Sequence, residues 1–101
     1  MIKGKLSGLI EYQRASVVSK EIVKGVNGSV TLFAFDHGQG LSEHIAPFDA
    51  FVYVFDGEVE ILISGKPHHL KEGETTVMPA NKPHSLKAAT PFKMLLVLIK
   101  K

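Results

Sequence analysis

Dipeptides that favour turns divide most of this chain at short intervals. Six of them separate runs rich in Val, Ile, Leu, Thr and Phe, namely Asn27-Gly28, Asp56-Gly57, Gly65-Lys66, Glu72-Gly73, Asn81-Lys82 and Thr90-Pro91. Runs of this composition between such turn signals are typical of short strands. Helical spacing occurs within residues 5–13, where Gly4 and Gly8 limit it to a short turn. The sequence therefore predicts an all-β fold.

The length and composition of the chain limit its organisation and its partners. The 101 residues form one domain, residues 1–101, with residues 1–15 as an N-terminal extension. The net charge is only +2 and the lysines are scattered, which disfavours nucleic acid as a partner. There is no cysteine, no apolar core of signal-peptide length, and no stretch that approaches the ~20 apolar residues of a membrane span. We therefore expect a cytoplasmic protein that does not enter a membrane.

The Asp56-Gly57 dipeptide predicts a β-hairpin with a two-residue type I′ turn, which fixes how the two strands pair. One face of this hairpin is uniformly apolar, with Val54 expected opposite Val59, Val52 opposite Ile61, and Ala50 opposite Ile63. This face is the expected interior of a barrel. If the strand continues through Pro47, the same alternation brings Ala46 and His44 to the interior as well.

The opposite face of the same hairpin is also apolar, because it contains Phe51, Tyr53 and Phe55. The runs at residues 32–35 and 94–99 are apolar on both sides too. Strands of an antiparallel barrel need only one buried face, so the outer face requires a cover. We expect a homodimer to provide it; the alternative is a two-layer sandwich that buries both faces within one chain.

The spacing of two segments resembles the two motifs of the cupin superfamily. The first segment, residues 38–57, has its fixed positions at Gly38, His44, Ala46, Ala50 and Gly57. The second, residues 73–84, has them at Gly73, Pro79, Asn81 and His84, with asparagine where the family usually has glycine. The resemblance implies a cupin-type double-stranded β-helix, which is a small, jelly-roll-like β-barrel. More narrowly, SEHIAPFDA and MPANKPH resemble a group of short single-domain cupins without a settled activity.

The resemblance also implies a metal site with a reduced set of ligands. Cupins commonly hold a divalent metal with three histidines and a glutamate; here His44 and His84 occupy two of these places, and Ala46 and Ala50 occupy the other two. A catalytic zinc site uses about three protein ligands, and a two-histidine iron centre also needs a carboxylate. We therefore expect His44 and His84 to bind zinc, nickel, iron or manganese weakly, and a standard cupin dioxygenase is disfavoured.

Three further side chains could complete a metal site. His37 and Gln39 belong to the DHGQG loop before the strand and could reach the mouth of the barrel. Asp49 faces away from His44 under strict alternation, so a kink at Pro47 would be needed to bring it round.

Two classes of function follow for the barrel interior. In the first, His44 and His84 hold a divalent metal with open positions for a small molecule, which allows Lewis-acid or proton-transfer chemistry. In the second, the barrel is metal-free and binds a small ligand, as a sensor or accessory module without catalytic activity. Both classes use a pocket whose expected wall consists of Ala46, Phe48, Ala50, Val52, Val54, Ile61, Ile63, Met78 and Leu86.

A purely structural role for the two histidines is the simplest alternative, since a buried imidazole commonly bonds a backbone carbonyl or a water. Against it stands the cost of burying two imidazoles among apolar residues, about 1–3 kcal/mol each unless each finds a partner. No nucleophile-elbow or phosphate-loop motif indicates another mechanism, so the sequence assigns no reaction.

Overall fold

The chain folds into nine β-strands and one short 3₁₀ helix, in a computed structural model that describes residues 3–100. The 3₁₀ helix η1 (Leu6–Gly8) precedes the strands β1 (Val17–Gly25), β2 (Gly28–Phe35), β3 (Gly40–His44), β4 (Phe48–Asp56), β5 (Glu58–Ile63), β6 (Lys66–Lys71), β7 (Thr75–Met78), β8 (His84–Ala88) and β9 (Phe92–Lys100). All six turn dipeptides of the sequence lie at junctions between consecutive strands. Within residues 3–100, no helix has the length and apolar character that a membrane crossing requires.

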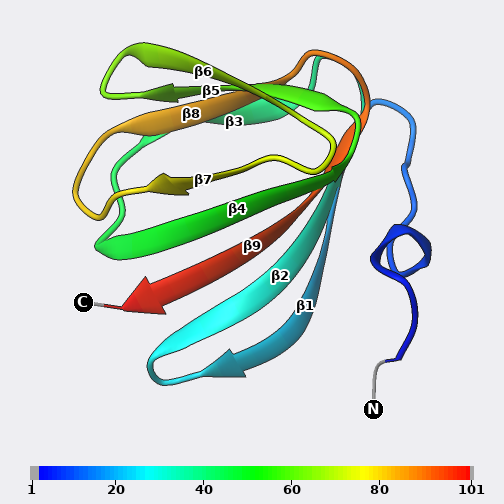
Figure 1. Cartoon of the computed structure of the whole chain (residues 1–101), viewed down its shortest axis with the longest axis horizontal. Coiled ribbons are helices and arrows are strands. Elements are labelled where there is room, and N and C mark those ends of the chain that lie inside the picture. Colours follow the sequence, from blue (N-terminus) through cyan, green and yellow to red (C-terminus); the bar gives the residue numbers. More distant parts are fainter. Residues whose placement is uncertain (1–2, 101) are drawn as a thin grey trace.

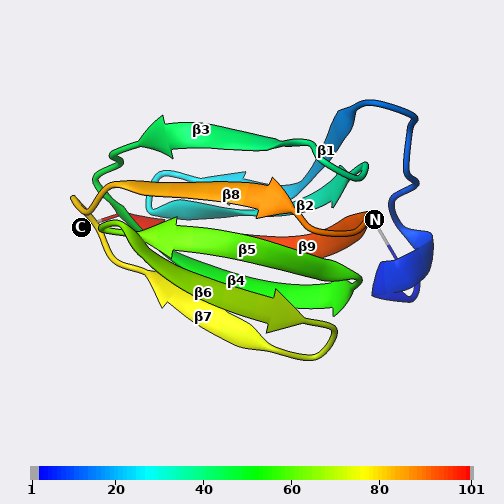
Figure 2. The same cartoon turned by 90° about the horizontal axis from the view of Figure 1, so that it is seen from above.

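The strands form two antiparallel sheets that face each other (Figure 1 and Figure 2). The five-stranded sheet has the order β1-β2-β9-β4-β7, and the four-stranded sheet has the order β3-β8-β5-β6. Consecutive strands are frequently in different sheets, so the chain crosses repeatedly from one sheet to the other. This arrangement confirms the predicted all-β, jelly-roll-like fold.

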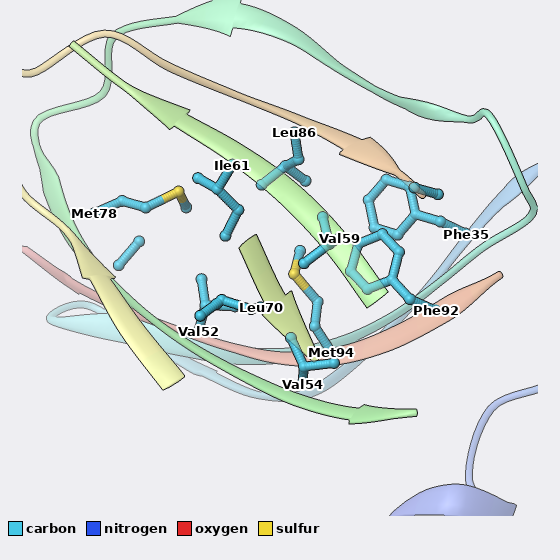
Figure 3. Packing of buried hydrophobic residues seen from close by; sticks show 12 residues of the cluster. Phe35, Val52, Val54, Val59, Ile61, Leu70, Met78, Leu86, Phe92 and Met94 are labelled. Carbon is cyan, nitrogen blue, oxygen red and sulfur yellow. The ribbon is translucent and has the colours of Figure 1, made fainter. Parts of the chain in front are cut away.

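Large apolar side chains fill the space between the sheets (Figure 3). Phe35 and Phe92 stack with their ring centroids 4.6 Å apart and their planes 10° from parallel. Val52 and Val54 of β4 lie on one side of the core, and Ile61 of β5 on the other; all three have no exposed surface. Burial of each such side chain stabilises the fold by about 1.5–3 kcal/mol.

The hairpin predicted at Asp56-Gly57 is wrong, because β4 pairs with β7 and β9 whereas β5 pairs with β6 and β8. The chain crosses between the sheets at this point. A type I′ turn needs a positive φ at both central residues, and although Gly57 has φ 73°, Asp56 is not among the residues with positive φ. The face predicted as interior is nevertheless buried, with exposed fractions of 0–2% at Ala50, Val52, Val54, Val59 and Ile61. These residues meet across the two sheets instead of within one.

The continuous strand through Pro47 is also not formed. β3 ends at His44 in the four-stranded sheet, and β4 begins at Phe48 in the five-stranded sheet. Residues 45–47 are therefore a second crossover between the sheets.

Residues 3–15 of the N-terminal extension pack on the outer face of the five-stranded sheet. Ile10 is only 4% exposed and forms a second apolar cluster with Leu32 and Ala34 of β2. Leu9 and Phe55 pack against the same cluster. The chain's own extension thus covers part of the face for which the sequence analysis considered a second copy of the chain.

Polar contacts fasten this extension to the sheet. The Tyr12 hydroxyl donates to the Asp56 carboxylate at 2.5 Å, and burial together with the Asp56 charge raises the pKa of Tyr12, which keeps the donor protonated. The ammonium group of Lys93 donates to the Ser7 carbonyl at 2.9 Å and lies 4.9 Å from the centroid of the Tyr12 ring. Lys93 is only 6% exposed, so its ammonium depends on these contacts for partners.

Another part of the outer face has no cover within residues 3–100. The outer apolar row takes one residue from each strand of the five-stranded sheet, in register: Val23, Val30, Val97, Phe51 and Val77. The exposed fraction is 58% at Val23, 52% at Val77 and 38% at Phe51.

Candidate functional site

A pair of histidines lies where β3 ends and β8 begins. His44 and His84 are paired residues of these two neighbouring strands. Their ring centroids lie 4.3 Å apart and their planes meet at 70°, an edge-to-face arrangement. The structure thus brings together the two histidines that the motif spacing singled out.

Both rings have the same hydrogen-bonding pattern. Nδ1 of His44 lies 2.8 Å from the carbonyl oxygen of Ser42, and Nδ1 of His84 lies 3.2 Å from that of Lys82. Because a carbonyl oxygen can only accept, each Nδ1 must donate. In the neutral rings, Nε2 then has a free lone pair that can accept a hydrogen bond or bind a metal.

The two rings differ in exposure. His44 is exposed, whereas His84 is only 5% exposed. Burial lowers the pKa of His84, the hydrogen bond to the Lys82 carbonyl acts in the opposite direction, and the nearby His44 lowers the pKa further. The neutral form of His84, with an accepting Nε2, is therefore favoured.

The histidines line one part of an apolar cavity of about 260 Å³, which we call the histidine cavity. Five residues of the predicted wall line it, namely Ala46, Phe48, Ala50, Met78 and Leu86. Five residues outside the predicted wall also line it, namely Phe33, Leu41, Met94, Leu96 and Leu98. The cavity therefore lies between the two sheets, at the end where β3 leads into β4 and β7 into β8.

The other four residues of the predicted wall do not line this cavity. Val52, Val54 and Ile61 are fully buried in the core, and Ile63 packs against that core. Because β4 and β5 lie in opposite sheets, their side chains fill the space between the sheets. The histidine cavity lies beyond them, where Ala46 and Ala50 present methyl groups.

Two loops are tied together beside the cavity. The backbone N–H of Asn81 donates to the Ala46 carbonyl at 2.8 Å, and the N–H of Ala80 donates to the Asp49 carboxylate, also at 2.8 Å. Asn81 has φ 65°, a conformation that asparagine tolerates better than most residues other than glycine. This explains how asparagine can stand where the motif usually has glycine. Asp49 bonds the loop backbone and does not line the histidine cavity.

The remaining candidate ligands are placed elsewhere. His37 lines a separate hollow of about 430 Å³ together with Glu60 and Lys87. Gln39 does not line the histidine cavity; its backbone N–H donates to the Asp36 carbonyl at 3.0 Å. The structure therefore does not bring His37, Gln39 or Asp49 to the histidine pair.

The usual cupin metal set does not fit these residues. Within residues 3–100, no group of three or more His, Cys, Asp or Glu side chains could hold a metal ion. Ala46 and Ala50 line the cavity at the places where the resemblance implies a histidine and a glutamate. Methyl groups there add apolar surface and space instead of ligands.

Sequence reasoning missed the part of the cavity that β2 and β9 supply. Alternation along β9 places Met94, Leu96 and Leu98 on one face, and Phe33 pairs with Met94 on β2. The apolar runs at residues 32–35 and 94–99 indicated buried strands here. Both faces of each run are apolar, so alternation alone could not tell the inner face from the outer one.

Two facing antiparallel sheets with a hollow at one end define a small β-barrel of the jelly-roll type. A comparison with protein families identifies a cupin domain over residues 31–98. The chain belongs to the cupin family, as its motif spacing implied. None of the curated proteins matches it.

Several solved structures are similar to this chain. A conserved protein of unknown function from Streptococcus pyogenes is 34% identical, with a TM-score of 0.94 over 99% of this chain and 88% of that one. A cupin superfamily protein from Desulfitobacterium hafniense is 26% identical, with a TM-score of 0.91 over 95% and 88% of the two chains. A cupin 2 conserved barrel domain protein from Leptotrichia buccalis is 44% identical, with a TM-score of 0.88; the match covers 93% of this chain and 46% of that one.

Proposed function

We propose that this cupin binds a small, largely apolar organic molecule in the histidine cavity, with a polar group of that molecule held by His44 and His84. The observation that supports this proposal is the cavity itself, about 260 Å³ of space lined by apolar side chains and two imidazoles. Ligand pockets are commonly concave and apolar, with a few polar groups that fix the orientation of the ligand.

The tautomer of the histidines defines what the ligand must offer. Each Nδ1 is already bonded to a carbonyl, at Ser42 or Lys82, so each Nε2 is left as an acceptor. A hydroxyl or another hydrogen-bond donor on the ligand would satisfy it. A polar group buried in an apolar site without a partner costs about 1–3 kcal/mol, so the pair favours ligands with such a donor.

A divalent metal is the second candidate occupant, because the same Nδ1 bonds are typical of histidines that ligate metals. Two imidazoles alone would hold zinc, nickel, iron or manganese weakly, and a small molecule or water would have to supply the other ligands. If no metal binds, the protein is a metal-free binding, sensor or accessory barrel. We propose no reaction for either case.

The binding proposal is tested by the melting temperature in the presence of primary alcohols with six, eight and ten carbons. A ligand at ten times its dissociation constant stabilises the native state by about 1.4 kcal/mol, which raises the melting temperature of a domain of this size by roughly 6–11 °C. Ala50→Leu should abolish the shift because leucine fills the cavity. His44→Ala/His84→Ala should weaken alcohol binding about tenfold by removing the hydrogen bonds.

His68→Ala/His69→Ala is the matched control, because both histidines are exposed and neither lines the cavity. The control should bind the alcohols like the natural chain. Alcohols that fail to stabilise the natural chain, or that stabilise Ala50→Leu equally, would refute the binding proposal.

The metal candidate is tested separately, by elemental analysis of gently purified protein and of His44→Ala/His84→Ala. Near-stoichiometric metal that disappears in the double variant supports it. If neither sample contains metal, and added zinc, nickel, iron or manganese leaves the melting temperature unchanged, the proposal that His44 and His84 bind a metal is refuted.

A further inference from the structure

Another hollow, distinct from the one at His37, lies beside the histidine cavity and is polar where the cavity is apolar. This polar groove, about 310 Å³ in volume, is lined by Glu21 and Lys24 of β1, Ser29 and Thr31 of β2, and Lys100 of β9. None of the residues of β1 is buried, so the groove is open to solvent along that strand.

The two hollows adjoin each other, because Phe48 and Leu98 line both of them. The inner face of β2 also changes character between them: Phe33 lines the histidine cavity, whereas Thr31 and Ser29 line the groove. The surface inside the barrel therefore passes from apolar to polar at Phe48 without leaving the inner face of the five-stranded sheet.

Phe48 marks this boundary. Its ring is half-buried, and the ammonium group of Lys100, a residue that lines the groove, lies 6.0 Å from the ring centroid. An apolar chain could contact the ring from within the cavity while a charged group on the same molecule reached the lysine.

The charges of the groove favour an anion. Lys24 and Lys100 outnumber the single carboxylate of Glu21. Within residues 3–100 one ion pair forms, between His69 and Glu58, so Glu21 is not paired with either lysine. The hydroxyls of Ser29 and Thr31 add neutral hydrogen-bond donors to the same surface.

We infer that the ligand is an amphipathic organic anion, whose apolar body occupies the histidine cavity and whose anionic group extends past Phe48 onto Lys24 and Lys100. This inference rests on the proposed function, because it requires that the cavity binds an apolar body. It adds the chemical class of the ligand and assigns the polar groove as the site of its charged end.

Two series of small molecules, matched in chain length, separate binding in the histidine cavity from binding of an anion in the polar groove. The primary alcohols described above offer a hydroxyl to the histidines but no charge. The ω-hydroxy carboxylates of the same chain lengths offer the same hydroxyl and add a carboxylate at the other end. At pH 8 and low salt, the best ω-hydroxy carboxylate should bind about tenfold more tightly than its alcohol, and the preference should shrink as salt is added.

Three variants test whether the groove residues cause the preference for the acid over the alcohol. Lys24→Met/Lys100→Met keeps the apolar stems but removes both charges, so it should bind acid and alcohol equally, with the alcohol affinity unchanged. Glu21→Gln removes the opposing carboxylate and should enlarge the preference for the acid. Lys5→Met/Lys66→Met removes two exposed charges that line neither hollow and should leave the preference as it is.

The outcomes are distinguishable. Alcohol binding with no preference for the acid overturns the inference while the proposed function stands. A preference that survives in Lys24→Met/Lys100→Met also overturns it, because the anion would then be held at the histidines. If neither alcohols nor acids bind, the proposed function and the inference both fall.

Discussion

At the scale of single residues, the site depends on two histidines and two alanines. His44 and His84 could be singled out from the sequence because the motif spacing resembled that of cupins, and pairing of β3 with β8 places them side by side. Their tautomers could not be predicted, because these depend on the carbonyls of Ser42 and Lys82, two residues before each histidine, being turned toward the rings.

The pH dependence of stability is the prediction at this scale. Burial lowers the pKa of His84 in the folded state, so below the unfolded value of about 6.5 the unfolded chain binds a proton that the folded chain does not. Stability should therefore be fully present above pH 6.5 and decrease as the pH falls through the folded pKa. Urea unfolding of chelator-treated protein at pH 7.5 and pH 5 measures this loss.

His84→Gln should lose less stability than the natural chain between these two pH values, because glutamine does not titrate. His69→Gln, which alters an exposed histidine bonded to Glu58, is the matched control for loss of a histidine outside the cavity. If His84→Gln and the natural chain lose equal stability between pH 7.5 and pH 5, His84 is not the group responsible for the loss.

At the scale of elements, the positions of the turns were predictable but the strand partners were not. The sequence identified Asp56-Gly57 as a turn, yet the strand before it, β4, and the strand after it, β5, belong to different sheets. Local sequence specifies that the chain bends here, whereas the choice of partner strands is a matter of tertiary contacts. Gly57 lies against Pro91 and Phe92, which are far along the chain. The inward alternation of β4 and β5 was correct because it requires only that the strands be extended.

Gly57→Ala tests this crossover. Gly57 has φ 73°, and a Cβ there would overlap the carbonyl oxygen of Pro91 and lie 2.8 Å from Cα of Phe92. We expect a loss of about 2–4 kcal/mol in the free energy of unfolding, measured by urea denaturation. Gly65→Ala is the control, since Gly65 has φ 79° but no atom within 4 Å of the added Cβ, and should cost about 1–2 kcal/mol. Equal costs for the two variants would show that the contact with β9 is unimportant.

At the scale of the whole molecule, the outer face is covered in two different ways. Residues 3–15 cover the region around Leu32 and Phe55. Alternation and turn signals could not predict this packing of the N-terminal extension. Val23, Phe51 and Val77 of the outer apolar row stay exposed. The homodimer and the cytoplasmic location stay predictions. Polar contacts of Lys93 and Asp56 with the extension were equally invisible in the sequence, since they join segments far apart in the chain.

The homodimer prediction now has a defined position, the outer apolar row. If a second copy covers this row, the natural chain at micromolar concentration should have twice its monomer mass by light scattering. Phe51→Glu should then be a monomer, because it puts a charge within the row, between Val97 and Val77. Val26→Glu, at an 83% exposed turn residue outside the row, should remain a dimer. A natural chain that is already monomeric would refute the prediction.

The repeated crossing of the chain between the sheets has a consequence for folding. The histidine cavity takes Phe33 from β2 and Leu98 from β9, and strands of both sheets lie between them in the chain. Pairings between such distant segments form slowly, because closing a long loop costs conformational entropy before any contact between the segments stabilises the chain. During synthesis, a ligand therefore has no complete pocket to enter until β9 has left the ribosome, and from then on its binding would favour the finished barrel over every partly folded form.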